Sequence, residues 1–392
     1  MTAATPSVSA RRRYDVTIRG GGIVGQTLAL LLARDRLRVA LVDDRQGISP
    51  APPGPADVRA YALNSASRAL LQSLRCWPDA DAAEAAPPFV TPVHAMQVHG
   101  DEGGQLGFNA AEQGGEALTW IVDVPALERR LADAVGYQSG IDRLVDAPAS
   151  ALTIVCEGKR SQTREALGIE FDVRPYPHQA LAARLRCEQP HGGVARQWFR
   201  DGQIMALLPL EGEQGHAVAL VWSLPAGDAQ ETRGLDATRF VEAVQNRCQH
   251  VLGSMSLEGP VQAWPLELSR ARRWIARTPQ GAAVLAGDAA HAMHPLAGQG
   301  LNVGLADVAE LARVLHEREY WRGLGDMRLL RRYERARQAD VHTMGWLTDG
   351  LFNLFGHSDS RVQALRNWGM TRVDHLGQLK HWLVRQASGV RA

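Results

Sequence analysis

The chain has 392 residues, enough for two or three domains, and its 45% hydrophobic and 22% charged residues are ordinary for a globular protein. Its 43 basic and 42 acidic residues leave a formal charge of +1, so no basic field is available to hold a nucleic-acid backbone. The four cysteines lie far apart without a CxxC pair, which argues against a zinc site or a disulfide framework.

The N-terminal part of the chain is predicted to alternate strands and helices. Residues 1–13 form a tail, residues 14–18 a short buried strand, residues 26–35 a helix and residues 38–43 a second strand, which is the order of a βαβ unit. No signal peptide is recognisable, and the longest apolar run, residues 23–33, is too short to span a bilayer. We therefore expect a cytoplasmic protein and leave open a peripheral contact with the inner membrane.

A glycine-rich turn, Gly20-x-Gly22-x-x-Gly25, lies between that first strand and helix. The first glycine allows the tight turn, the second lets the backbone approach a pyrophosphate, and the third lets helix and strand pack closely. Asp43 ends the second strand, where a carboxylate accepts hydrogen bonds from ribose hydroxyls, although Asp44 beside it is an alternative. The residues predicted to bind a dinucleotide here are Gly20, Gly22, Ile23, Val24, Gly25 and Asp43.

The middle of the chain changes from helical periodicity to strict alternation. Helices are expected over residues 64–75, 124–135 and 235–252, and short strands over 94–99 and 151–156. Asp201-Gly202 is a hairpin signal between two alternating runs. The alternation predicts an antiparallel sheet inserted into an α/β chain, with strands in residues 178–187, 193–200, 203–210 and 216–224.

The second motif follows a buried strand over residues 281–287. Asp288 ends that strand, so its carboxylate can accept hydrogen bonds from the ribityl hydroxyls of a flavin. A glycine-rich loop, 295–300, then opens a helix over 301–318 and frees backbone N–H groups for the flavin's pyrimidine edge. The alternative is a metal triad of Asp288, His291 and His294. The glycine-rich loop fits a flavin better, so no metal is predicted.

The string from Gly287 to Asp307 closely resembles the second flavin motif of the single-component aromatic hydroxylases similar to p-hydroxybenzoate hydroxylase. Within them it is most similar to the ubiquinone-biosynthesis hydroxylases, and the resemblance covers about residues 14–388. Supporting stretches are Asp57-x-Arg59-x-x-Ala62-Leu63 and residues 197–210, 218–225 and 333–340.

The expected fold class is α/β, with a Rossmann-like FAD-binding domain, an inserted antiparallel-sheet substrate domain and a helical C-terminal region. The FAD-binding domain is expected to be discontinuous, over residues 1–75, 119–170 and 265–325. The substrate domain is assigned residues 76–118 and 171–264, and the C-terminal region residues 326–392.

The resemblance implies an FAD-dependent monooxygenase that hydroxylates an aromatic ring with NAD(P)H and O2. Its substrate would be lipophilic, a polyprenyl phenol in ubiquinone biosynthesis. Arg59 would lie beside the flavin and help to engage the nicotinamide donor. The further expected cofactor-binding residues are Glu157, Gly287, Asp288, Pro295, Gly298, Gln299, Gly300, Leu301 and Asn302. The expected substrate-pocket residues are Gln197, Leu208, Pro209 and Trp222, and no catalytic base is identified.

Three departures from the family pattern keep an alternative open. Glu157 stands where an aspartate is expected and reaches ~1.5 Å further. Arg19 precedes the glycines where a small or apolar residue is expected, and the segment 135–151 is short. The alternative is a flavin-binding paralogue with weak or no hydroxylase activity, acting as a partner in a quinone-biosynthesis assembly. A two-dinucleotide reductase would need a second GxGxxG, which the sequence lacks.

The C-terminal helical region carries more apolar side chains than one helix stripe needs. This predicts a surface that contacts the membrane or a partner protein. Burial of these side chains within the monomer is an equal alternative. The residues concerned are Trp346, Leu347, Leu351, Phe352, Leu354 and Phe355.

Overall fold

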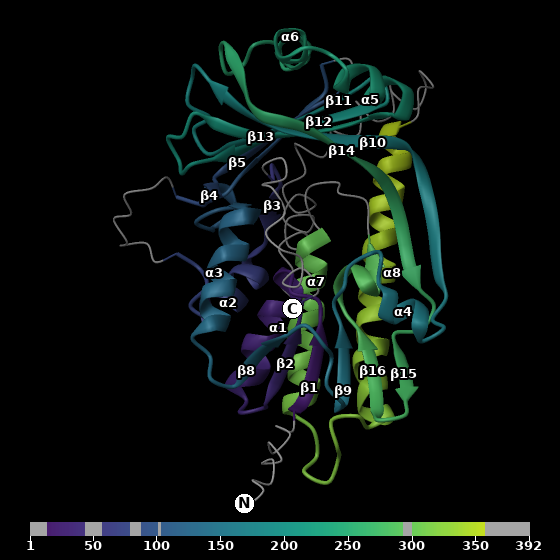
Figure 1. Cartoon of the computed structure of the whole chain (residues 1–392). Helices are drawn as coiled ribbons and strands as arrows, with labels where there is room; N and C mark the ends of the chain where they lie inside the picture. The colour runs from purple at the N-terminus through teal and green to yellow at the C-terminus, as the bar shows by residue number, and fades with distance from the viewer. Residues whose placement is uncertain (1–13, 44–56, 79–87, 101–102, 293–299, 357–392) are drawn as a thin grey trace, which may run out of the picture.

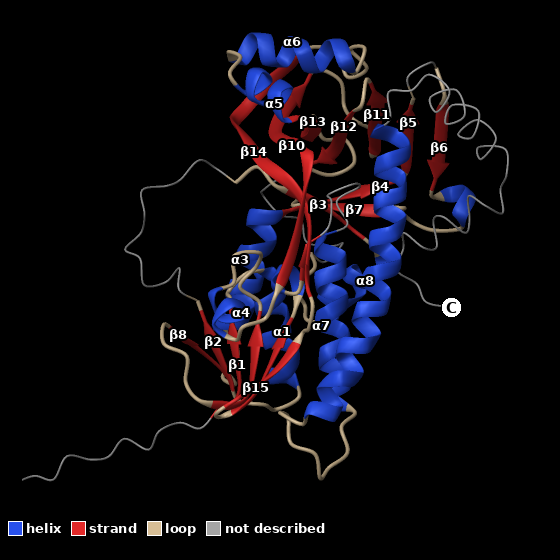
Figure 2. Ribbon diagram, turned by 90° about the vertical axis from the view of Figure 1, so that its right-hand side faces the viewer, coloured by secondary structure: helices blue, strands red, loops and turns tan. Residues whose placement is uncertain are grey.

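The computed structural model describes residues 14–43, 57–78, 88–100, 103–292 and 300–356, with side chains as far as Thr343. Figure 1 shows a lower body built on one sheet and an upper body built on another, with a long helix running beside both. The lower sheet has six strands, the upper sheet eight, and a third sheet has three strands, which Figure 2 shows between the two bodies. Among the described helices, none combines the length and the hydropathy that a membrane-spanning segment needs.

The six-stranded sheet is parallel except at one edge. Its order is β15-β16-β9-β1-β2-β8, and β15 pairs antiparallel with β16. The bounds are β1 (Tyr14–Arg19), β2 (Val39–Val42), β8 (Ile141–Leu144), β9 (Ser150–Val155), β15 (Ile275–Thr278) and β16 (Gly281–Leu285). Strand β2 is apolar at every position and buried along its whole length, as is typical of an inner strand of a parallel sheet.

Helix α1 (Ile23–Arg34) directly follows β1 and is buried over most of its length. It packs against α3 (Val124–Gly136) and α7 (Gly300–His316), and α7 in turn packs against α8 (Met327–Gly356). The predicted β1–α1–β2 unit is therefore confirmed, with the helix beginning three residues earlier than expected because Gly22 acts as its N-cap. In Figure 2, α8 runs along the molecule from the lower body to the upper one.

The eight-stranded sheet has the order β17-β14-β10-β13-β12-β11-β5-β6. Asp201 and Gly202 both have positive φ in the β11–β12 turn, which confirms the predicted hairpin. Helices α5 (Ala226–Arg233) and α6 (Ala237–Arg247) cover one face. The strands are β5 (Ala95–His99), β6 (Gln105–Asn109), β10 (Phe171–Cys187), β11 (Val194–Arg200), β12 (Gln203–Leu210), β13 (Ala217–Pro225), β14 (Met255–Ala271) and β17 (His291–Ala292).

Two differences from the sequence-based expectation concern the sheets. Strand β14 is 17 residues long and runs through the expected domain boundary at residue 264, pairing with β10 along almost its whole length. The three-stranded sheet was missed because its strands have only four or five residues each. It has the order β3-β7-β4. The remaining elements are β3 (Ala60–Leu63), β4 (Val90–Val93), β7 (Thr119–Asp123), α2 (Ser65–Ser73), α4 (Gln162–Ala166), η2 (Ala111–Gln113) and η3 (Gly287–Ala289).

Candidate active site

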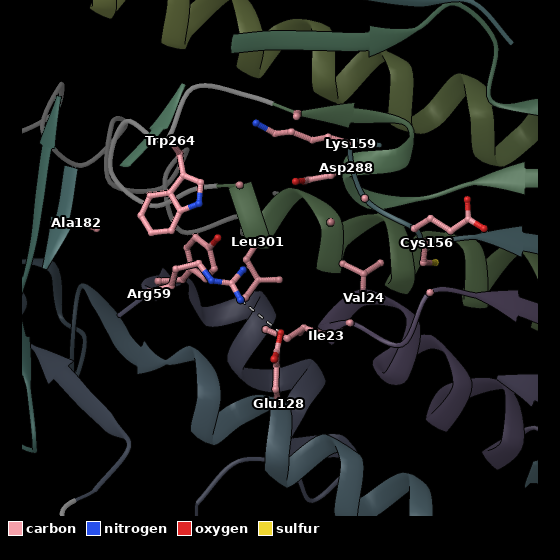
Figure 3. Close-up of a pocket in the computed structure, with 18 of the residues that line it drawn as sticks. Ile23, Val24, Arg59, Glu128, Cys156, Lys159, Ala182, Trp264, Asp288 and Leu301 are labelled. Carbon is pink, nitrogen blue, oxygen red and sulfur yellow. Dashed lines mark ion pairs between the residues drawn. The ribbon is translucent and has the colours of Figure 1, made fainter. Parts of the chain in front are cut away.

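A cavity of about 540 Å³ lies between the six-stranded and eight-stranded sheets. Its floor is the carboxyl edge of the parallel strands, where the loops after β1, β2, β9 and β16 meet, as expected for ligand sites in such sheets. Its roof is the lower face of the eight-stranded sheet. Figure 3 shows Arg59, Trp264 and Asp288 projecting into this space from three different parts of the chain.

The glycine loop shows three different local constraints. Gly20 has φ +113°, and a Cβ there would lie 2.3 Å from the carbonyl oxygen of Cys156. A Cβ on Gly25 would lie 1.9 Å from the carbonyl oxygen of Gly20, so helix and strand can approach only without a side chain. Within the described part of the chain, no atom lies within 4 Å of an added Cβ on Gly22, and this glycine lines the cavity. Because no side chain caps α1, its first N–H groups are left for a ligand.

Asp43 follows β2 and lies against the glycine loop. A Cβ on Gly21 would lie 2.2 Å from Oδ2 of Asp43, so the loop glycine makes room for that carboxylate. Asp43 also lines the cavity. An acceptor beside an open helix N-terminus fits the ribose and pyrophosphate of a dinucleotide. The alternative residue, Asp44, lies outside the described residues.

The two glycine motifs meet at Val24 of α1. A Cβ on Gly287 would lie 3.2 Å from this side chain, and one on Gly304 would lie 3.0 Å from it. The first motif therefore packs directly on the strand end and the helix of the second motif. Asp288, in η3, is exposed and lines the cavity, and desolvation by the surrounding protein raises the pKa of its carboxyl.

The start of α7 contributes Gly300 and Leu301 to the cavity wall. The side chain of Asn302 is buried and engaged by the protein, so the expected cofactor contact at Asn302 is left to its backbone N–H. Its Nδ2 donates to the carbonyl of Ala62 at 2.8 Å, and its Oδ1 accepts from Asn64 N at 3.0 Å and from Ser67 Oγ at 2.8 Å. The side chain of Asn302 thus holds α7 to the β3–α2 segment. Pro295, Gly298 and Gln299 lie outside the described residues.

Arg59 enters the cavity from the segment before β3. Asp57 accepts from it at 2.6–3.0 Å, and Glu128 of α3 lies 3.8 Å away. The hydrogen bonds with Asp57 outweigh burial and raise the pKa of Arg59, so it stays a cation. Tyr61, two residues on, also lines the cavity, and burial raises the pKa of its hydroxyl. Sequence reasoning did not single out Tyr61, Glu128 or Trp264.

Glu157 follows β9 and forms an ion pair with Arg19, whose Nε lies 2.8 Å from Oε1. The same carboxylate accepts from Ser161 Oγ and from the N–H and Oγ1 of Thr163 at the start of α4. Burial raises the pKa of Glu157, but the hydrogen bonds from Thr163, Ser161 and Arg19 outweigh it, and the net pKa lies below its usual value. Two departures from the family pattern, 138 residues apart, are thus direct partners.

A buried polar network connects the residues of the second glycine motif to Arg337 of α8. Asp307 of α7 is fully buried and accepts from Gly287 N at 2.9 Å, from His291 Nε2 at 2.6 Å and from Arg337 Nε at 2.7 Å. The Nε2 of His291 is therefore engaged by Asp307. The described residues contain no group of three or more side chains that could hold a metal ion, and His294 lies outside them.

The predicted substrate wall needs a correction. Trp222 lies on the face of the sheet that α5 and α6 cover, where it packs with Leu220 and Phe240 and donates to Gln203. Gln197, Leu208 and Pro209 are not among the described residues that line the cavity. Side chains of the opposite face line it instead, from neighbouring β10, β13 and β14. They are Ala180, Ala182, Ala219, Val221, Trp264 and Leu266.

The comparisons with known proteins agree with this geometry. A family model described as an FAD binding domain matches residues 144–344. The chain is 30% identical to the ubiquinone hydroxylase UbiL of Rhodospirillum rubrum, covering 97% of this chain and 91% of that protein. It is 27% identical to the 3-demethoxyubiquinol 3-hydroxylase of Escherichia coli, covering 96% and 98%.

Among solved structures, the fold is similar to p-nitrophenol 4-monooxygenase PnpA from Pseudomonas putida. The TM-score is 0.71 at 16% identity, covering 97% of this chain and 99% of that one. The fold is also similar to PqsL of Pseudomonas aeruginosa, with a TM-score of 0.71 at 20% identity, covering 91% and 100%. Ubiquinone hydroxylases match the chain along almost its whole length, and the FAD-binding family model matches residues 144–344. The chain therefore belongs to the FAD-dependent aromatic monooxygenases, in the group of the ubiquinone-biosynthesis hydroxylases.

Proposed function

We propose that this protein hydroxylates the ring of a polyprenyl phenol in ubiquinone biosynthesis, with NAD(P)H as electron donor and O2 as co-substrate. The observation that carries this proposal is the continuous cavity of about 540 Å³, which joins the glycine loop to an apolar sheet face. FAD bound in this cavity supplies the chemistry that activates O2. The substrate class is supported by the names of the relatives, a ubiquinone hydroxylase and a 3-demethoxyubiquinol 3-hydroxylase.

The described residues fit FAD along the whole floor of the cavity. We propose that Gly20, Gly22 and the N-terminus of α1 hold its pyrophosphate and that Asp43 holds its adenosine ribose. Asp288, at the other end of the floor, would accept from the ribityl hydroxyls. At Gly22 and Gly300 an added Cβ would meet no atom of the described residues within 4 Å, which supports this path.

The roof of the cavity suits an aromatic ring with an apolar tail. Ala180, Ala182 and Ala219 have small side chains, so they leave room below the sheet, while Trp264 is 36% exposed and offers a ring face. An apolar wall opposite the flavin excludes water from the reacting ring. We propose that these residues, and not Trp222, form the substrate side of the site.

Filling this roof is expected to block the substrate without removing the cofactor. Ala182→Trp should lower kcat/KM for a phenol about 10- to 100-fold, since the indole would occupy the space that we assign to the substrate and such overfilling costs about 1–3 kcal/mol. Flavin content should stay that of the wild type, measured by absorbance after release. Val173→Trp, at an exposed position of the same strand, is the matched control. Equal loss of activity in both variants would remove Ala182 from the substrate wall.

The proposed function is tested by the absorbance spectrum of the purified protein during anaerobic titration with NADH and NADPH. We expect a flavin spectrum that bleaches, faster when a prenylated phenol is present, and a phenol product that gains one oxygen atom in air. A flavin that never bleaches with either donor, in the presence of candidate phenols, would contradict the proposal. It would favour the flavin-binding partner without hydroxylase activity.

We also propose a peripheral contact with the inner membrane or with a quinone-biosynthesis partner, from the cytoplasmic side. The chemistry of the substrate supports it, because each CH2 group exposed to water costs ~0.8 kcal/mol. The predicted surface from Trp346 to Phe355 lies on α8, but its side chains are outside the described part. Co-sedimentation with liposomes, with flavin content as the control, tests this contact.

A further inference from the structure

Arg19 and Glu157 lie at the carboxyl ends of two adjacent parallel strands, β1 and β9. The register pairs Arg19 with Val155, and the amide of Cys156 donates to the carbonyl of Arg19 at 2.7 Å. This backbone pairing brings the Arg19 guanidinium to the Glu157 carboxylate, with 2.8 Å between Nε and Oε1. Both residues line the cavity beside the glycine loop.

The Glu157 carboxylate has no capacity left for a ligand. Oε1 accepts from Arg19 Nε at 2.8 Å and from Thr163 Oγ1 at 2.6 Å. Oε2 accepts from Ser161 Oγ at 2.7 Å and from Thr163 N at 3.0 Å. A carboxylate offers about four lone-pair positions, and these four donors use them. Glu157 therefore acts on a cofactor through another residue.

Arg19 is in the opposite situation. A guanidinium carries five N–H donors, and Glu157 is the partner that the described residues provide, through Nε alone. The side chain of Arg19 is 29% exposed. Arg19 lines the cavity together with Gly20, Gly21 and Gly22, so its side chain borders the space beside the glycine loop. A planar fork with free donors is suited to phosphate oxygens.

We propose that Arg19 binds the pyrophosphate of the dinucleotide at the glycine loop and that Glu157 is the residue that positions it. The inference deepens the proposed function, since it concerns the cofactor that this function requires. It also explains why two unusual residues occur together: Glu157 without Arg19 would place an uncompensated negative charge near an anionic ligand, and Arg19 without Glu157 would lose its orientation.

The test is a double-mutant cycle on the affinity of the full-length apoprotein for FAD, with ADP as a second probe that keeps the pyrophosphate. Arg19→Gln should weaken FAD and ADP about 10- to 100-fold, the size of a lost charged hydrogen bond, and should flatten the salt dependence. Glu157→Ala should weaken FAD severalfold. Adding Glu157→Ala to Arg19→Gln should cause no further loss, because Glu157 acts through Arg19.

Arg38→Gln is the matched control. Arg38 forms an ion pair of the same length, 2.8 Å, with Asp142 of β8 in the same sheet, but at the opposite strand ends and away from the cavity. FAD affinity in this variant should equal that of the wild type. Thermal unfolding of each apoprotein separates a loss of binding from a loss of fold.

Two results would overturn the inference. One is an Arg19→Gln variant that binds FAD as the wild type does. The other is a Glu157→Ala loss that persists in the Arg19→Gln background. If Glu157→Ala unfolds because Thr163 loses its acceptor, Glu157→Gln, which keeps one acceptor oxygen, takes its place in the cycle. Because affinity is measured, a wild-type protein that fails to hydroxylate phenols contradicts only the proposed function.

Discussion

Asp307→Asn should lower the free energy of unfolding by about 3 kcal/mol, which is within the usual cost of breaking a buried ion pair. Asp307 is fully buried, and its partner Arg337 is 7% exposed at the side chain, so the variant leaves a buried cation without its main counter-charge. The side-chain NH2 of the new asparagine would also face one of the three N–H donors, from Gly287, His291 or Arg337, so that two donors would meet without an acceptor.

Denaturant unfolding of the apoprotein measures this loss. Glu317→Gln is the control, because Glu317 pairs with Arg313 at the surface and exposed pairs contribute about 0–1 kcal/mol. We also expect weaker flavin binding in Asp307→Asn, since the Gly287 amide that Asp307 holds directly precedes Asp288. A variant as stable as the wild type would show that the network does not stabilise the fold.

The contribution of Asp307 should depend on pH. Burial raises the pKa of its carboxyl, but His291 and Arg337 outweigh burial and hold the net pKa below the ordinary value. A carboxyl with a depressed folded-state pKa stabilises the fold above its unfolded value of about 3.9 and loses that contribution as the pH falls through the folded-state pKa. The gap in stability between wild type and Asp307→Asn should therefore shrink on acidification below about pH 4. A gap that stays constant to lower pH would contradict this assignment.

Gly22→Ala should weaken FAD about 10- to 100-fold while leaving the apoprotein as stable as the wild type. Gly22 has φ −78°, which alanine adopts without strain, and its Cβ would meet no protein atom within 4 Å. The methyl group would instead occupy the space that we assign to the pyrophosphate, and overfilling costs about 1–3 kcal/mol. Fluorescence titration of the apoprotein with FAD measures the loss.

Two other glycines make this prediction specific. Gly136→Ala, at the end of α3, also meets nothing within 4 Å but lies outside the cavity, so FAD affinity should be unchanged. Gly25→Ala should lower the stability of the apoprotein itself, because its Cβ would lie 1.9 Å from the Gly20 carbonyl oxygen. If Gly22→Ala bound FAD normally, the pyrophosphate would have to lie elsewhere.

Some of the site was predictable because its signals are local in the chain. The strand, glycine turn, helix and acidic strand end over residues 14–43 form one contiguous unit, and Gly20, Gly22 and Asp43 do lie together at the cavity floor. The second motif is also contiguous from Gly287 onward. The geometry of such contiguous motifs depends on the backbone conformation of a few neighbouring residues, which the residue types themselves determine.

Other parts of the site could not be predicted, because they depend on where side chains lie relative to elements that are distant in the chain. Alternation along β13 shows that Trp222 and Val221 face opposite sides, but alternation cannot tell which side α5 and α6 cover. Asn302 has a sequence position typical of a cofactor ligand. Its side-chain amide is nevertheless hydrogen-bonded to the β3–α2 segment, where its partner Asn64 lies 238 residues earlier in the chain.

By itself, the sequence determined the family, the βαβ unit and the two glycine motifs, because these depend on contiguous residues with characteristic spacing. Only the tertiary structure decided that Arg19 and Glu157 are partners, that Asp307 joins His291 to Arg337, and that an alanine-rich face forms the roof of the cavity. The physical reason is that partner choice depends on strand register and helix packing between segments far apart in the chain, and one residue of register reverses which side chains face the site.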